Sequence, residues 1–236
     1  MEKLINIFSE NKTQYLVFIS LSMSMLILTG IMYGLDKSSY QRFLGRMNPM
    51  LIYIITMLLG ILLMSFLLSA STCKVYQKAA LSRIIFIVGI PLILIVGIIW
   101  VDTKGVFPKD LNIEFPHSLL FYPSIAYFVE IIFHVLPFTI CFFVITTVFK
   151  QLDQAKALLI TISLVALIEP IFQIINFGRN YPAWAIAYVG ANILVINLSQ
   201  LWLLVKYDFV SMFALRLVYY FLWHIIWGEL RLRWLF

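Results

Sequence analysis

Residues 84–101 read IIFIVGIPLILIVGIIWV, a run of 18 positions without a charged side chain. A helix of about 20 apolar residues crosses the hydrocarbon core of a bilayer, which is roughly 30 Å thick. The run is therefore predicted to span a membrane, and similar runs lie on both sides of it, separated by charged, glycine-containing or proline-containing segments. The seven predicted spans are Tyr15–Gly34, Met50–Ala70, Ile84–Val101, Ser118–Phe149, Ala157–Phe177, Ala183–Val205 and Phe209–Trp227.

The composition of the whole chain agrees with these runs. Of the 236 residues, 63% are hydrophobic and only 12% are charged, whereas soluble domains carry about 25% charged residues. This excludes a soluble enzyme, a disordered tail and a secreted disulfide scaffold. The net charge of +6 is read as basic loops that face anionic membrane lipids, and no nucleic-acid partner is predicted. Two cysteines, Cys73 and Cys141, are too few for a disulfide framework or a zinc cluster.

The fourth run, Ser118–Phe149, is about 32 residues long and exceeds what one perpendicular helix needs. A tilted helix, a break near Pro123 or Pro137, and an additional short element are the three explanations that stay open. The predicted number of spans is therefore seven or eight.

The fold class predicted from these observations is all-α, a polytopic transmembrane helix bundle. All loops are short except residues 102–117, so residues 1–236 are expected to form one integral membrane domain. Residues 1–117 would be an N-terminal three-helix part, and residues 118–236 would hold the helices that carry polar side chains. The protein is expected to be a multi-pass membrane protein, with the plasma membrane as the default location.

Ionisable residues inside the spans are the strongest functional signal, because each costs several kcal/mol at membrane depth unless it is paired or hydrated. Glu130 and His134 lie four residues apart in the fourth run, and Glu169 and Gln173 have the same spacing in the fifth. Residues four apart lie on one face of a helix. With His224 in the last run, they predict a polar, hydrated cavity between the fourth, fifth and seventh spans.

Two prolines lie close to these polar pairs. Pro137 and Pro170 each leave a carbonyl without its helical partner, at Phe133 and Ala166 respectively. Such carbonyls are tolerated inside a membrane only against protein or internal water. The prolines therefore agree with a polar interior at this depth.

Structural interpretations stand beside the functional one. Glu130 and His134 can form a self-satisfied pair or an interhelical hydrogen bond, Glu169 can bond a carbonyl at a kink, and His224 can belong to an interfacial aromatic belt. Three arginines are expected to contact lipid headgroups: Arg216, Arg231 and Arg233. Three amides are expected to form interhelical hydrogen bonds: Asn192, Asn197 and Gln200.

A buried carboxylate can act as general base to a water, while an imidazole orients or protonates the reacting groups. The zinc helix signature of two histidines flanking a glutamate is absent, so no cofactor is expected, although a divalent metal held by glutamate and histidine stays open. No P-loop, dinucleotide-binding or serine-hydrolase motif occurs. Hydrolysis by a Glu/His-activated water, a proton or substrate relay, and no chemistry at all are the alternatives.

Residues 128–134, FVEIIFH, resemble the first motif of the CAAX-processing endopeptidase and bacteriocin-processing (Abi, CPBP) membrane protein family. That motif has two adjacent glutamates followed, after three residues ending in phenylalanine, by arginine. Glu130 stands at the second glutamate and Phe133 at the aromatic residue. Val129 replaces the first glutamate, and His134 replaces the arginine.

Two later motifs of the family also have partial counterparts. Residues 219–228, YYFLWHIIWG, resemble its His-x-x-x-Asn motif, with His224 at the histidine and Gly228 at the asparagine. The family's intervening motif is an aromatic residue followed four positions later by histidine, and Leu167–Gln173 offers Glu169 there. The resemblance covers the chain from Ser118 onward.

This resemblance implies a membrane-embedded Glu/His-type endopeptidase that acts on a peptide or membrane protein in or at the bilayer. Glu130 would be the general base, His134 its partner, Glu169 a second acid and His224 an electrophile or orienting group. The alternative function is a non-catalytic protein that binds a partner, such as an immunity-type protein or a transporter-complex subunit. A proton-coupled carrier is disfavoured because the sequence shows no internal repeat.

Overall fold

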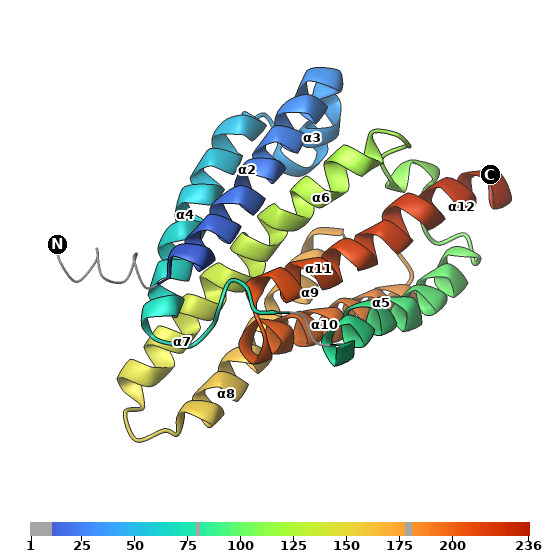
Figure 1. Cartoon of the computed structure of the whole chain (residues 1–236). Helices are drawn as coiled ribbons and strands as arrows, with labels where there is room; N and C mark the ends of the chain where they lie inside the picture. Colours follow the sequence, from blue (N-terminus) through green and yellow to red (C-terminus); the bar gives the residue numbers. More distant parts are fainter. Residues whose placement is uncertain (1–10, 79–80, 178–180) are drawn as a thin grey trace.

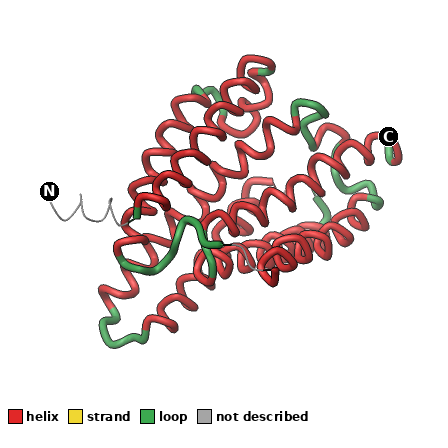
Figure 2. The backbone as a smooth tube through the Cα atoms, viewed as in Figure 1, coloured by secondary structure: helices red, strands yellow, loops and turns green. Residues whose placement is uncertain are grey.

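The computed structural model describes residues 11–78, 81–177 and 181–236, and in these residues every regular element is a helix (Figures 1 and 2). The helices are α2 (Lys12–Leu35), α3 (Lys37–Leu44), α4 (Pro49–Ser69), α5 (Leu81–Asp102), η1 (Lys109–Leu111), α6 (Ser118–Val129), η2 (Glu130–Val135), α7 (Leu136–Val148), α8 (Gln154–Ala166), α9 (Ile168–Phe177), α10 (Ala183–Lys206), α11 (Phe209–Tyr220), η4 (Phe221–Trp227) and α12 (Gly228–Trp234).

Seven helices or continuous runs of helix in the described residues are long and apolar enough to cross a membrane. Each coincides with one of the runs predicted from the sequence, so the predicted polytopic helical bundle is confirmed. The spans are Lys12–Leu35, Pro49–Ser69, Leu81–Asp102, Ser118–Val148, Gln154–Asn176, Ala183–Lys206 and Phe209–Trp234. The protein is therefore an integral, multi-pass membrane protein.

The long fourth span is one continuous helix formed by α6, η2 and α7. Its middle section, Glu130–Val135, is a π-helix that lies directly before Pro137. Proline lacks the N–H donor and its ring collides with the carbonyl four residues earlier, and a wider turn relieves both problems. Of the three explanations left open, a break near Pro123 or Pro137 is thus not found, because the helix continues through a wide turn, and no eighth span appears in the residues that the structure describes.

The spans pack as two groups around two apolar cores. Figure 1 shows α2, α4 and α6 side by side, and α5, α10 and α11 in a second group. Phe18 and Phe138 are buried in the larger core, while Leu203 is buried in the smaller one. Helix α11 contributes to both, because Phe213 packs in the first core and Leu215 in the second. The middle of α11 therefore lies where the two groups meet.

Two buried ion pairs fasten the ends of α5 to the last span. At one end, Nη1 of Arg83 donates to Asp208 over 2.6 Å. At the other end, Nε and Nη2 of Arg231 donate to the two carboxylate oxygens of Asp102 over 2.7 and 2.9 Å. The side chain of Arg231 is completely buried, so the prediction that it contacts headgroups is wrong. Arg233 is exposed instead and pairs with Glu229.

Candidate functional site

Arg216, on α11, lies at the centre of a buried ion cluster. Its Nε donates to Oε1 of Glu130 over 2.7 Å, and its Nη1 and Nη2 donate to the two carboxylate oxygens of Glu169 over 3.2 and 2.9 Å. Only 2% of Arg216 is exposed. The prediction that this arginine contacts headgroups is therefore wrong: it faces two carboxylates brought from η2 and α9. We call Glu130, His134, Glu169 and Arg216 the ion cluster.

Neutral polar side chains from α10 and α11 complete the contacts of the guanidinium. Nη2 of Arg216 donates to Gln200 over 2.9 Å and to Asn197 over 3.4 Å, and Nη1 donates to the Tyr220 hydroxyl over 3.2 Å. The Gln200 amide also donates to Oε1 of Glu130. The cluster thus connects four helical segments, η2, α9, α10 and α11, in the middle of the bundle.

The predicted amide contacts are confirmed. Nδ2 of Asn197 donates to the Ala166 carbonyl over 3.3 Å, which is the carbonyl that Pro170 leaves without a helical partner. Asn192 links α5 and α11, because it donates to the Leu94 carbonyl and accepts from the Tyr219 hydroxyl. Gln200 makes interhelical bonds as well, but to charged groups.

His134 lies between the two carboxylates without a hydrogen bond of good geometry. Its Nδ1 is 3.2 Å from Oε2 of Glu130, and its Nε2 is 4.0 Å from Oε2 of Glu169. Both ring nitrogens and Oε2 of Glu130 are buried and lack a hydrogen-bond partner. Two carboxylates thus face one guanidinium, and the imidazole of His134 lies between the carboxylates.

His224 does not join the ion cluster. It lies eight residues after Arg216, roughly 12 Å further along the helix. Its Nδ1 donates to Asn112 over 2.7 Å, and its ring stacks on Tyr122 with the centroids 4.4 Å apart. The predicted convergence of Glu130, Glu169 and His224 is therefore correct for the two glutamates and wrong for the histidine. The alternative interpretation placed His224 in an interfacial aromatic belt; it does contact the rings of Tyr220 and Trp223, and its position at the membrane interface stays a prediction.

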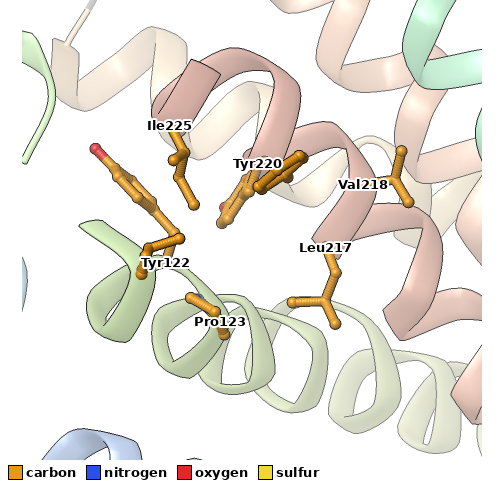
Figure 3. Close-up of a pocket in the computed structure, with 8 residues that line it drawn as sticks. Tyr122, Pro123, Leu217, Val218, Tyr220 and Ile225 are labelled. Atoms are coloured by element: carbon orange, nitrogen blue, oxygen red, sulfur yellow. The ribbon is translucent and has the colours of Figure 1, made fainter. Parts of the chain in front are cut away.

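The hydrated cavity predicted among these residues is not seen at the ion cluster. Glu130 and His134 are completely buried, and the polar groups pair mainly with one another. The described part of the chain has a groove of about 310 Å³ between α6 and the α11–η4 segment. Figure 3 shows Tyr122, Leu217 and Tyr220 around this groove. The hydroxyl of Tyr220 also accepts a hydrogen bond from Arg216. The groove therefore lies beside the ion cluster and contains none of its four residues.

The described residues contain no group of three His, Cys, Asp or Glu side chains arranged to hold a metal ion. The carboxylates of Glu130 and Glu169 instead receive hydrogen bonds from Arg216. A guanidinium thus occupies the place between the carboxylates that a metal ion would take. This arrangement does not fit the divalent metal that the sequence left open.

Arg216 is the residue that sequence reasoning assigned to the wrong place. Arginines near helix ends can extend their side chains to the headgroups. Arg216, however, is seven residues from the start of α11, or about 10 Å along the helix, and 18 residues from the end of the span. This position deep within the span could have indicated from the sequence that Arg216 needs a buried acidic partner.

The chain matches no family model, no curated protein and no solved structure. The fold defines the class, a multi-pass helical membrane protein with a buried ion cluster at the junction of two helix groups. Any finer functional statement rests on the geometry of the cluster.

Proposed function

We propose that this protein is a non-catalytic, CAAX-protease-like membrane protein that acts by binding a partner within the bilayer. In this proposal the ion cluster fixes the packing of the helices and does not activate water. The observation that carries the proposal is the position of Arg216, which donates hydrogen bonds to both carboxylates. We further propose the plasma membrane as the location, which membrane fractionation would test.

The chemistry of the guanidinium supports this proposal. Arginine does not release its proton in proteins, so Arg216 cannot serve as an acid or a base. A carboxylate oxygen that accepts a hydrogen bond from this guanidinium is engaged in that contact and is less available to a water. Both glutamates predicted to do acid–base work are held in this way.

The family resemblance supports the same conclusion when the family's late motif is matched to residues that contact one another. Arg216 and Tyr220 are four residues apart and contact one another, and Arg216 faces Glu130. We propose that this pair, and not His224 with Gly228, corresponds to the family's His-x-x-x-Asn motif. An arginine then stands where the family has a histidine, and the acid–base group of that motif is lost.

A second candidate function is hydrolysis, and one observation favours it. Oε2 of Glu130 and both ring nitrogens of His134 are buried without hydrogen bonds, as they would be if a water normally joined them. In that case Oε2 of Glu130 takes a proton from the water, the hydroxide attacks a peptide carbonyl, and the same proton passes to the departing amine.

The two functions are separated by a search for cleavage products. Cells would express the wild type, Glu130→Gln or Glu229→Gln, and new protein N-termini in their membranes would be compared by mass spectrometry. Glu229 is the matched control, since its side chain is 40% exposed and pairs only with Arg233. We expect the same termini in all three samples. Termini that appear with the wild type and Glu229→Gln but disappear with Glu130→Gln would establish the hydrolase instead.

A further inference from the structure

A polar hollow of about 330 Å³ lies where α3 and the segment before α6 meet. Its lining includes the carboxylates of Asp36 and Glu114, the guanidinium of Arg42 and the imidazole of His117. Among the residues that the structure describes, none forms a hydrogen bond or ion pair with the side chains of Glu114 and His117. Arg42 uses only Nη1, which donates to the Asp110 carbonyl over 2.5 Å. The hollow thus offers two carboxylates, of which that of Asp36 already caps α3, one imidazole and a free guanidinium edge.

The apolar groove described above begins beside this hollow. Leu119 and Pro123, in the first two turns of α6, line one side of the groove, and Leu217 and Ile225 line the other. Pro123 is five residues from the start of α6, which corresponds to about 7 Å of depth. The groove therefore runs from the outer part of the hydrocarbon layer at Pro123 to the depth of Leu217, beside Arg216 in the middle of the bundle, as an acyl chain does.

Tyr122 connects the two features. Its ring lines the groove, and its hydroxyl bonds the Ile113 amide over 3.0 Å and Asn112 over 3.4 Å. Asn112 and Ile113 both line the polar hollow. A molecule with a charged head and an apolar chain can therefore place its head in the hollow and its chain in the groove, on either side of Tyr122.

We propose that the hollow and the groove together bind a phospholipid with a primary ammonium beside its phosphate, that is, phosphatidylethanolamine. Arg42 and His117 bind the phosphate, Glu114 binds the ammonium, and one acyl chain lies in the groove against Leu217. The charges select this lipid, because an anionic headgroup without an ammonium would leave Glu114 facing negative charge. The inference goes beyond the proposed function and does not depend on the role of the ion cluster.

The test measures binding of short-chain phosphatidylethanolamine and phosphatidylglycerol to the delipidated full-length protein in detergent, by native mass spectrometry. For the wild type, we expect tighter binding of phosphatidylethanolamine. One lost charge-assisted contact corresponds to about a tenfold change in Kd. Glu114→Gln should therefore raise the Kd for phosphatidylethanolamine about tenfold and, because the repulsion is removed, lower that for phosphatidylglycerol, whereas Arg42→Gln should weaken both.

Leu217→Trp fills the groove and should weaken both lipids. Its matched control is Leu159→Trp on α8, where the leucine is 65% exposed and lies away from the groove; this change should have no effect. Glu114 and Arg42 are exposed, so their variants test the headgroup site without disturbing the core. Equal wild-type affinities for the two lipids, or an unchanged phosphatidylethanolamine Kd in Glu114→Gln, would overturn the proposal.

Discussion

The ion pairs at the ends of α5 and the ion cluster in the middle of the bundle use the same residue types differently. At the end of α5, Asp102 meets one arginine, and Trp227 donates a further hydrogen bond over 2.7 Å. Nη1 of Arg231 donates to the carbonyls of Pro108 and Lys109, and Nη2 also donates to that of Phe107. Each acid at the ends has one base.

In the ion cluster, two acids share one base. Arg216 serves both Glu130 and Glu169, and His134 and Oε2 of Glu130 lack hydrogen bonds. The comparison shows that removing the base from a one-to-one pair leaves one carboxylate without its cation, whereas removing the single base of the ion cluster leaves two. The effect of a substitution should therefore depend on how many charges lose their partner.

Arg216→Met should have the largest effect. It leaves two carboxylates buried in the membrane interior without their cation, and breaking a buried ion pair costs about 3–5 kcal/mol. Thermal unfolding in detergent measures the loss. Arg233→Met is the matched control, because its pair with Glu229 is exposed and worth less than about 1 kcal/mol. Similar unfolding temperatures for the two variants would contradict the assignment.

Cys73 provides an independent readout of this unfolding. It lies outside the spans with 4% exposure, and burial raises the pKa of its thiol to about 12. The thiolate is the reactive form, so Cys73 should resist a maleimide at neutral pH in the folded wild type. In a Cys141→Ser background, Arg216→Met should label faster than wild type during mild heating, and an equal rate would count against destabilisation.

Arg231→Met should have the next largest effect. It leaves one carboxylate, Asp102, which keeps its bond from Trp227 and lies at the end of a span. Lost hydrogen bonds to a charged group cost about 1.5–3 kcal/mol, so the loss should be smaller than for Arg216→Met. Chemical unfolding of the two variants under identical conditions checks the order, and a reversed order would break the comparison between end and middle.

His134→Leu should change stability by less than about 1 kcal/mol, because no hydrogen bond is lost and an apolar side chain of similar size replaces two unpartnered nitrogens. Thermal unfolding measures this as well. A loss of several kcal/mol would contradict this expectation and show that the imidazole helps to hold the two carboxylates together.

The smallest effect concerns the Asp36 cap of α3. Hydrogen bonds from the Ser38 and Ser39 hydroxyls lower the pKa of Asp36 below its ordinary value of 3.8. A lowered folded-state pKa contributes stability that is present above 3.8 and is lost as the pH falls through the folded value. Asp36→Asn should therefore flatten the fall in unfolding temperature below pH 4, and an unchanged fall would remove Asp36 as its source.

The spans were predictable because a membrane helix is defined by length and apolarity, both of which the sequence displays. The pairing of Glu130 with His134 on one face followed from helical spacing, and the carbonyl freed at Ala166 followed from Pro170. The partner of Glu130 did not follow, since the rotation of α11 about its axis decides whether Arg216 faces protein or lipid. The position of His224 was wrongly predicted for the same reason, because residues eight positions apart in one span, such as Arg216 and His224, can face different neighbouring helices.

The central claim is that Glu130, Glu169 and Arg216 form one structural unit. The most direct test is the thermal unfolding of the triple variant Glu130→Met, Glu169→Met, Arg216→Met beside Arg216→Met alone. Replacing a whole buried ion group by apolar side chains of similar volume is often nearly neutral, so the triple variant should recover to within about 1 kcal/mol of the wild type. A triple variant as unstable as Arg216→Met would contradict the claim.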